Sequence, residues 1–231
     1  MVARVGSAAK SRLAGTLSVD QRHSLALAML GDVLSVCHQA HYRSLGQGRD
    51  GTLATDGPDA IAGTLAVIDE AAARAVALHN GAIAIADPGR GDMNAAVTVG
   101  IAAARARGAG TVLILPGDVP LISTDDLQAL LDSAGQAPRV VVVGASQDAQ
   151  GTNALLLRPP DVIAPAFGPP SVGRHVRAGL AAGAHTVVRA GLGLALDVDT
   201  PDDLARLQTA APGPHTAAAL AQLSLRQSVR I

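Results

Sequence analysis

The sequence is almost without aromatic side chains, which make up only 1% of its 231 residues, and it contains no tryptophan. Proteins that bind single-stranded nucleic acid stack the bases on such rings, so this class of function is disfavoured. The formal net charge of −1 provides no broad basic surface for nucleic acid or an anionic membrane. A hydrophobic fraction of 48% with so few rings predicts a core of Ala, Val, Leu and Ile, as where helices pack on a sheet.

Cysteine is nearly missing as well. Cys37 stands alone in an apolar run, which excludes an internal disulfide framework and a cysteine metal site and predicts a buried thiol. No apolar segment is long enough to span a bilayer, and the first residues lack the apolar stretch of a signal peptide. We therefore expect a cytoplasmic protein with no nucleic-acid and no membrane partner. The sequence does not determine the oligomeric state, and a homo-oligomer is compatible with it.

Apolar runs alternate with helical patterns from about residue 82 onward. The runs that predict strands are 82–86, 111–115, 140–143, 153–157, 186–189 and 192–198. Segments with helical spacing lie between them, and Ser18, Ser123 and Thr200 each occupy the N-cap position of a predicted helix. This order predicts an α/β domain with a mainly parallel mixed sheet and helices on both faces.

Three other stretches are less regular. Residues 61–79 are alanine-rich with helical spacing and predict one helix, whereas 51–55 predict a short strand before a turn. Pro212-Gly213-Pro214 breaks the pattern near the end. We therefore place the main domain at residues 1–210 and expect 211–231 to be a C-terminal tail that forms a loosely attached helix.

Three aspartates at the ends of predicted strands are the strongest candidates for chemistry. Asp118 lies in L-P-G-D-V-P, directly after the strand at 111–115. Asp197 and Asp199 lie two residues apart in L-A-L-D-V-D-T-P, so in an extended chain their carboxylates face the same side, roughly 6.6 Å apart along the backbone. Such carboxylates repel one another unless a cation lies between them, and their hard oxygen atoms suit Mg²⁺.

Each aspartate also has a purely structural interpretation. Asp118 could bond its own backbone in the turn, and from the residues alone the two interpretations weigh about equally. Helix capping does not account for Asp197 and Asp199, because Thr200 already caps the helix that follows. The metal interpretation therefore leads for this pair.

Two loops could contact a nucleotide. Lys10, the only lysine of the chain, lies with Arg12 in a Gly/Ala-rich loop whose backbone amides could approach phosphates, although the Walker A spacing is absent. Asp87 and Asn94 lie at either end of a strand-to-helix turn that could hold a ribose or a base edge. A solvated basic loop and a plain turn are the structural alternatives.

Two further segments could bind an acidic substrate through hydroxyl and backbone N–H groups. Thr152 opens a strand, and Gly168 precedes Ser171, which is expected to cap a helix. A turn and a cap are the structural alternatives. The histidines show no metal-ligand spacing, and we expect His175 to lie on the surface of its helix.

Taken in order, the motifs resemble those of the guanylyltransferase family of coenzyme F(420) biosynthesis. The similar motifs are K-S-R-L-A, D-P-G…N-A-A-V, L-P-G-D-V-P-L, G-T-N-A-L-L-L-R-P-P, F-G-x-x-S-x-x-x-H and L-D-V-D-T-P-D-D-L. They run from about Lys10 to Leu207, nearly the whole chain. The resemblance implies a GT-A-like nucleotidyltransferase fold and transfer of GMP from GTP to a phosphorylated three-carbon acid, with release of pyrophosphate. Family substrates are phosphoenolpyruvate, 2-phospho-L-lactate and, in some members, 3-phospho-D-glycerate.

The resemblance also implies residue roles. The catalytic, metal-binding positions are Asp118, Asp197 and Asp199, which would hold Mg²⁺, as a pair of ions. The expected GTP contacts are Lys10, Arg12, Asp87 and Asn94, and the expected contacts to the phospho-acid are Thr152, Gly168 and Ser171. A general base is not required, because the substrate phosphate is itself the nucleophile.

Two alternatives stay open. A molybdopterin-type nucleotidyltransferase, or an enzyme that uses CTP, is disfavoured because the L-x-G-G-x-S-x-R-M-G loop of that group is missing. A family member that binds a nucleotide or a partner without turnover is the second. It is suggested by two departures from the family pattern: only Met1 to Val5 precede the basic loop, and residues 41–55 are unusually polar.

Overall fold

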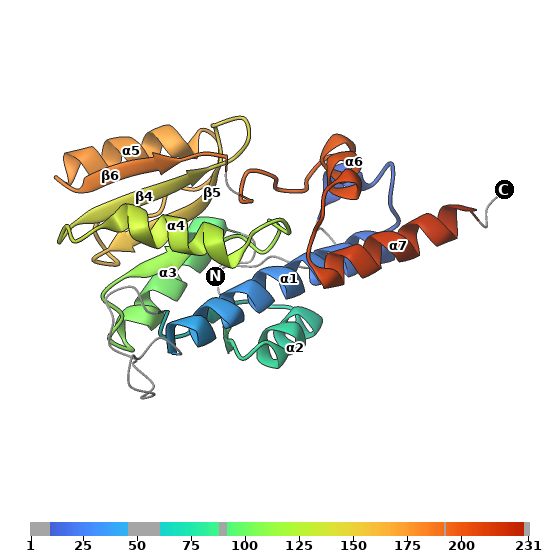
Figure 1. Cartoon of the computed structure of the whole chain (residues 1–231), viewed down its shortest axis with the longest axis horizontal. Coiled ribbons are helices and arrows are strands. Elements are labelled where there is room, and N and C mark those ends of the chain that lie inside the picture. Colours follow the sequence, from blue (N-terminus) through green and yellow to red (C-terminus); the bar gives the residue numbers. More distant parts are fainter. Residues whose placement is uncertain (1–9, 46–60, 88–91, 192, 229–231) are drawn as a thin grey trace.

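The computed structural model describes residues 10–45, 61–87, 92–191 and 193–228. The expected strand at 51–55 and the stretch from Met1 to Val5 lie outside this part of the chain. The described residues form an α/β structure in which helices cover both faces of a central sheet (Figure 1).

The central sheet has four hydrogen-bonded strands in the order β3-β5-β4-β6. These strands are β3 (Val112–Ile114), β4 (Val140–Ala145), β5 (Thr152–Arg158) and β6 (His185–Arg189). Strands β3, β4 and β6 share one direction, because β4 pairs in parallel with β6 while β3 and β4 both pair antiparallel with β5. A separate parallel pair joins β1 (Leu65–Val67) to β2 (Ile83–Ile85). The predicted mixed sheet is confirmed, with β5 as the reversed strand of the four.

Alternation of side chains along the strands produces the three layers. The covering helices are α1 (Val19–Leu45), α3 (Met93–Arg105), α4 (Thr124–Ala134) and α5 (Ser171–Ala181). Val141 and Val143 of β4 pack with α3 and α5, whereas Val140 and Val142 face the opposite side and pack with α1 and α4. Cys37 of α1 belongs to the second cluster, and burial raises the pKa of its thiol to about 11, as expected for an inert core thiol.

Helix starts lie where the capping residues predict them. Ser18 and Gln21 exchange the two side-chain-to-backbone hydrogen bonds of a capping box at the start of α1. Ser123 caps α4 through the amide of its third residue, and Thr200 does the same for α6 (Pro201–Thr209). These caps satisfy amides that would otherwise lack acceptors.

The single helix predicted at 61–79 is wrong. The segment begins with strand β1, and the helix α2 occupies only Ala71–His79. Glu70 caps the helix, since its carboxylate accepts from the amides of Ala72 and Ala73. Pairing of β1 with β2 outweighs the helical preference of the alanine-rich sequence, a choice that local spacing cannot show.

The strand predicted at 192–198 is also wrong, although its burial pattern is as expected. Leu194, Leu196 and Val198 are buried, whereas Asp197 and Asp199, which alternate with them, are partly exposed. Residues 193–198, the part of this segment that the structure describes, join no sheet ladder. They are held by single bonds instead, such as that from the Asn153 side chain to the Leu194 carbonyl, 2.7 Å.

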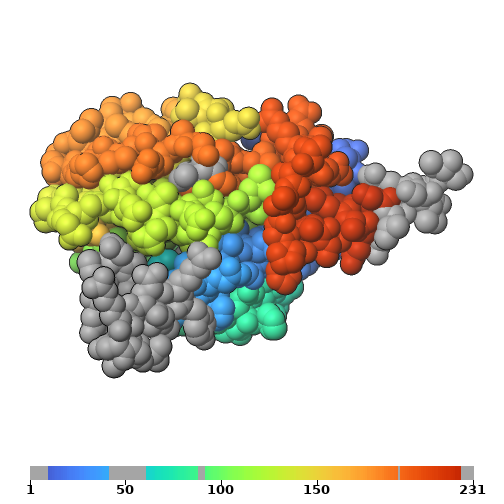
Figure 2. All heavy atoms as spheres, in the orientation of Figure 1, coloured from blue at the N-terminus to red at the C-terminus, as the bar shows by residue number. Residues whose placement is uncertain are grey.

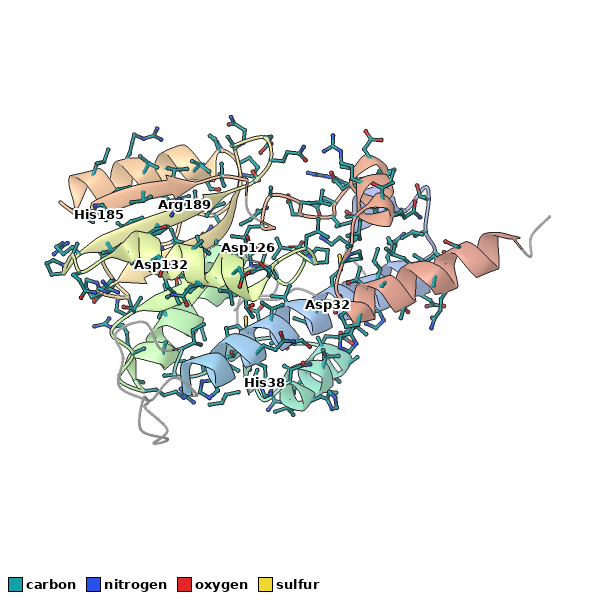
Figure 3. The ribbon with its side chains drawn as sticks, in the orientation of Figure 1. Asp32, His38, Asp126, Asp132, His185 and Arg189 are labelled. Carbon is teal, nitrogen blue, oxygen red and sulfur yellow. The ribbon has the colours of Figure 1, made fainter. Side chains whose placement is uncertain are left out.

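The C-terminal tail contains the expected helix, α7 (Pro214–Ser228), which packs against α1 rather than lying free. In the space-filling view the red C-terminal segment lies against blue residues of the N-terminal part of the described chain (Figure 2). Leu220 and Leu223 are buried in this contact. Asp32 of α1 is buried beneath the start of α7, where its carboxylate accepts from the amides of His215 (3.0 Å) and Thr216 (2.8 Å) (Figure 3). The boundary at residue 210 stays a prediction, but the attachment of the tail is closer than the sequence indicates.

Within the described ranges, no helix combines the length and the apolar character that crossing a membrane requires.

The buried Asp32 cap provides a test of the attachment of α7. Asp32→Ala should lower the free energy of unfolding by about 2 kcal/mol, because two helix N-terminal amides lose a charged acceptor. Chemical denaturation followed by circular dichroism would measure this difference. Gln39→Ala, at an exposed position of the same helix, is the control and should change the stability by less than about 0.5 kcal/mol. Equal effects of the two substitutions would contradict the capping role.

Candidate active site

The predicted catalytic and acid-binding residues line one cleft of about 660 Å³. Asp118, Asp197 and Asp199 line one part of it, called the charged end below, and Thr152, Gly168 and Ser171 line the part called the acid-substrate end. The lining also includes the charged side chains of Arg12, Asp148, Asp203 and Arg206. These residues come from the segment after β3, the segment before α6, and the loops around β5 and α5. The structure therefore brings together residues that are far apart in the sequence.

Backbone bonds fix the positions of the three carboxylates. The amide of Val198 bonds the carbonyl of Asp118 at 3.4 Å and joins the two acidic segments. The amide of Asp199 donates to the Asp203 carboxylate at 3.2 Å, so the capping box of α6 also holds the backbone of Asp199. The Asp197 carboxylate accepts from the Asn153 side chain at 3.3 Å.

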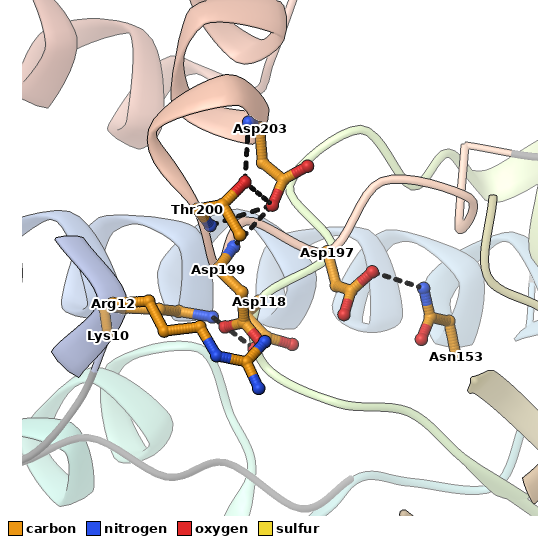
Figure 4. Close-up of polar contacts among 8 residues, drawn as sticks. All are labelled: Lys10, Arg12, Asp118, Asn153, Asp197, Asp199, Thr200 and Asp203. Carbon is orange, nitrogen blue, oxygen red and sulfur yellow. Dashed lines mark hydrogen bonds and ion pairs between the residues drawn. The ribbon is translucent and has the colours of Figure 1, made fainter. Parts of the chain in front are cut away.

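The side chain of Lys10 lies between two of the aspartates (Figure 4). Its Nζ is 2.5 Å from Asp118 Oδ2 and 2.9 Å from Asp199 Oδ1, and only 6% of the side chain is exposed. Burial by itself lowers the pKa of Lys10, but the two carboxylates outweigh burial and the pKa is raised. Lys10 is therefore a buried cation that bridges the two acidic segments.

One lysine does not neutralise three carboxylates. Arg12 is 72% exposed, and its Nη1 is 3.9 Å from Asp199 Oδ2, so its contribution is small. The pKa of Asp197 is raised, mainly by burial and then by the neighbouring Asp118 charge, although the Asn153 hydrogen bond opposes the shift. The cluster thus keeps an excess of negative charge that favours a further cation.

The carboxylate oxygens suit a hard divalent ion in chemistry, but they are not arranged as a ready set. Among the residues that the structure describes, no three His, Cys, Asp or Glu side chains form a group that would hold a metal ion. Instead, Lys10 lies between Asp118 and Asp199 and forms an ion pair with each. The sequence pattern singled out both the aspartates and Lys10 but not their direct contact.

The other end of the cleft offers neutral hydrogen-bonding groups from Thr152, Gly168 and Ser171, and Asp148 of the loop before Thr152 also lines the cleft. Ser171 is the first residue of α5 and makes no capping bond, so the predicted serine cap is wrong. Its Oγ instead lies 3.0 Å from Thr152 Oγ1 on β5. Both side chains are almost fully buried at the cleft wall, at 1% and 5% exposure.

His175 lies behind these two hydroxyls, and the expectation of a surface position is wrong. The ring is fully buried, and it contacts the edge of Phe167 at 5.1 Å between ring centroids. Its two nitrogens bond Thr152 Oγ1 and the amide of Ala166, each at 3.0 Å. Burial, and then the Arg174 charge, lower the pKa of His175 to about 4. The F-G-x-x-S-x-x-x-H spacing was the available signal, since it places a histidine one helical turn after Ser171.

The loop at 166–170 is held from outside by side chains. Asn94 accepts from the Phe167 amide at 2.7 Å and donates to the Phe167 carbonyl at 3.2 Å. The Arg174 guanidinium bonds the carbonyls of Ala166, Phe167 and Gly168. Gly168 has a φ of +97°, a conformation that glycine adopts without strain.

Of the four predicted nucleotide contacts, Arg12 lines the cleft, whereas Lys10, Asp87 and Asn94 do not. Lys10 is nevertheless bonded to two of the lining aspartates. The Asn94 side chain orders the Phe167 loop instead, and residues 88–91, between Asp87 and Asn94, lie outside the described part of the chain. Their roles toward GTP stay predictions.

Relatives of known name match most of the chain. A family model described as guanylyl transferase CofC like matches residues 56–230. A phosphoenolpyruvate guanylyltransferase of Conexibacter woesei is 37% identical over 96% of this chain and 92% of its own length. That of Rubrobacter xylanophilus is 39% identical over 87% of each chain.

Solved structures show the same fold at low sequence identity. A protein assigned as a nucleotide-diphospho-sugar transferase from Desulfovibrio desulfuricans G20 superposes with a TM-score of 0.63 at 15% identity, covering 98% of this chain and 95% of that chain. A nucleotidyl transferase from Methanothermobacter has a TM-score of 0.54 at 15% identity, covering 90% and 94%. These likenesses confirm the predicted nucleotidyltransferase fold.

The buried neutral His175 makes stability depend on pH. Its pKa falls from 6.5 in the unfolded chain to about 4 in the folded protein, so the unfolded chain binds more protons in between. This contribution to stability is complete above the unfolded pKa and is lost as the pH falls toward the folded pKa.

From about pH 7 to about pH 4.5, wild-type protein should therefore lose about 2 kcal/mol more unfolding free energy than His175→Asn. Urea denaturation at the two pH values measures the difference, and other titrating groups cancel in the comparison. Parallel losses in both proteins would show that His175 is not the responsible group.

Proposed function

Because the chain belongs to the family of CofC-like guanylyl transferases, we propose that it transfers GMP from GTP to phosphoenolpyruvate or 2-phospho-L-lactate and releases pyrophosphate. We place this reaction in coenzyme F(420) biosynthesis. We favour phosphoenolpyruvate as the acceptor, because the similar proteins are named phosphoenolpyruvate guanylyltransferases. The chain is a nucleotidyltransferase, and the observation that carries the proposal is a single cleft with a charged carboxylate–lysine cluster at one end and neutral donors at the other.

The charged end is proposed to receive the triphosphate. Asp118, Asp197 and Asp199 supply the oxygen donors for Mg²⁺, which neutralises the phosphate charge when it is bound. Lys10 holds two of these carboxylates, and its ammonium group is positioned to exchange them for phosphate oxygens when the nucleotide enters. Arg12, exposed at the rim of the cleft, provides a second cation for the phosphates.

The acid-substrate end is proposed to hold the phospho-acid. Thr152, Ser171 and the backbone of Gly168 line this end and offer hydroxyl and amide donors to an oxyanion. The substrate phosphate then points toward the α-phosphorus of GTP. One of its oxygens forms the new P–O bond while the bond to pyrophosphate breaks, and the nucleophile needs no general base because it is already deprotonated. This agrees with the neutral and buried state of His175, which lies behind the wall of the cleft.

Nucleotide and acceptor specificity test the proposal directly. The protein incubated with Mg²⁺ and phosphoenolpyruvate or 2-phospho-L-lactate should release pyrophosphate with GTP and not with CTP, ATP or UTP. Mass spectrometry should find the guanylylated acid. Release with CTP and a molybdopterin acceptor but not with GTP would favour the alternative enzyme. Binding of GTP in calorimetry with no product from any of the family's acids would favour a catalytically inactive binding protein.

The carboxylate cluster makes a second prediction. Asp199→Asn should lower the turnover number by at least about two orders of magnitude. The substitution removes the negative charge of the carboxylate that pairs with Lys10 and would bind the metal ion. Asp202→Asn is the matched control, since Asp202 is exposed in the first turn of α6 and lies outside the cleft lining. Near-normal turnover of Asp199→Asn would remove this residue from the catalytic assignment.

A further inference from the structure

The protonation state of a buried histidine determines which groups donate hydrogen bonds at the end of the cleft where the acid substrate is proposed to bind. The Ala166 amide can only donate, so His175 Nε2 must be an unprotonated acceptor. The ring is neutral because burial lowers its pKa to about 4, and a neutral ring with a bare Nε2 carries its proton on Nδ1. Nδ1–H therefore donates to Thr152 Oγ1.

This donation fixes the polarity of the two hydroxyls. Thr152 Oγ1 is already an acceptor, so its own proton must go elsewhere, and the neighbouring oxygen is Ser171 Oγ at 3.0 Å. The two hydroxyls have two protons but share only one hydrogen bond. Whichever of them donates to the other, one proton is left to donate to a group outside the pair. The opposite tautomer would reverse this result, because Thr152 would then donate to the ring and the pair would offer only lone pairs.

The backbone amide of Gly168 provides a further hydrogen-bond donor at this end of the cleft. In the loop from Ala166 to Val172 the amides of Ala166, Phe167, Ser171 and Val172 have acceptors within the protein, and the two prolines have no N–H. Among the described residues, the Gly168 amide has no such acceptor. The carbonyls of this loop are taken up by Arg174 on its outer side. The amide and the spare hydroxyl proton thus leave a donor-rich wall that suits an anion.

We propose that His175 is a positioning residue for the acid substrate: its Nδ1–H commits the Thr152–Ser171 pair to donate a hydrogen bond to an oxyanion in the cleft. The ring contacts the hydroxyl pair and not the substrate, so it acts through Thr152. This inference rests on the proposed function, which places the phospho-acid at this end of the cleft. It adds a residue whose hydrogen-bond direction determines whether the end attracts or repels an anion.

Two substitutions at His175 distinguish the effect of its Nδ1–H hydrogen bond from the effect of its packing in the core. His175→Asn keeps an N–H near the position of Nδ1, and His175→Leu keeps the bulk without a donor. The KM for phosphoenolpyruvate should rise about tenfold in His175→Leu and stay within about threefold of wild type in His175→Asn, while the KM for GTP changes less than about twofold in both. His185→Asn, at an exposed histidine of β6, is the control for the substitution itself (Figure 3).

Thr152→Val tests whether the effect of His175 is transmitted through Thr152. If His175 acts through Thr152, adding His175→Leu to Thr152→Val should raise the KM for phosphoenolpyruvate by no more than about twofold. Independent effects of the two substitutions would overturn the relay. So would equal KM values for the Asn and Leu variants, or a rise in the KM for GTP as large as that for the acid, provided thermal unfolding shows that both variants fold.

Nitrogen NMR of the histidine rings tests the relay without any turnover. Long-range ¹H–¹⁵N spectra of wild-type protein at neutral pH should show His175 with a protonated Nδ1 and a bare Nε2. A proton on Nε2 would overturn the inference whatever the activity. If wild-type protein transfers no GMP but shows the Nδ1–H ring, the proposed function fails while the hydrogen-bond polarity of the site stands.

Discussion

The arrangement of the cleft depends on one buried cation. Lys10 lies between Asp118 and Asp199, two carboxylates that would otherwise repel each other where the segment after β3 meets the segment before α6. Taking an ammonium group out of water is costly unless it is paired, so the two short ion pairs also hold the N-terminal loop against the cleft. In the described residues the three aspartates do not form a ready metal group, and two of them are paired with Lys10 instead. A cation of the protein occupies the place where a divalent ion would be expected to bind.

The two ends of the cleft differ in their electrostatic character. At the charged end, carboxylates exceed the cations that face them, and the raised pKa of Asp197, due first to burial and then to Asp118, reflects this excess. At the end lined by Thr152, Gly168 and Ser171, an anion is met by an amide and a hydroxyl whose orientation is set by His175. Among the charged side chains that line the cleft, the one nearest in sequence to this end is Asp148, which lies in the loop before Thr152. The hydroxyl and amide donors at one end favour an oxyanion, whereas the carboxylate cluster at the other end favours a cation.

Much of this arrangement could be predicted from the sequence, because it depends on local signals. Capping residues at Ser18, Ser123 and Thr200 place three helix starts, and apolar runs identify most strands of the sheet. The alternation of Leu194, Leu196 and Val198 gives the correct burial, although the segment is not a strand. A strand needs a neighbouring strand to which its backbone can hydrogen-bond. The spacing of apolar residues in the sequence does not show whether the tertiary structure provides one.

The unpredicted features all depend on contacts between distant segments. The sequence predicts a surface position for His175, yet β5 and the Ala166 loop cover both of its nitrogens. Ser171 resembles a cap by position, but its hydroxyl bonds Thr152, nineteen residues away. The pairing of Lys10 with two aspartates across more than a hundred residues could not be read from the motif that contains it.

The central claim is that Lys10 acts as the resident counter-ion of the carboxylates and competes with a divalent cation for them. Calorimetric titration of Mg²⁺ into nucleotide-free protein tests it most directly, with wild type compared with Lys10→Met. Removing the ammonium group should lower the dissociation constant for Mg²⁺ by at least about threefold, because Asp118 and Asp199 are then free to bind the ion. An unchanged or weaker affinity in Lys10→Met would contradict this account of the site.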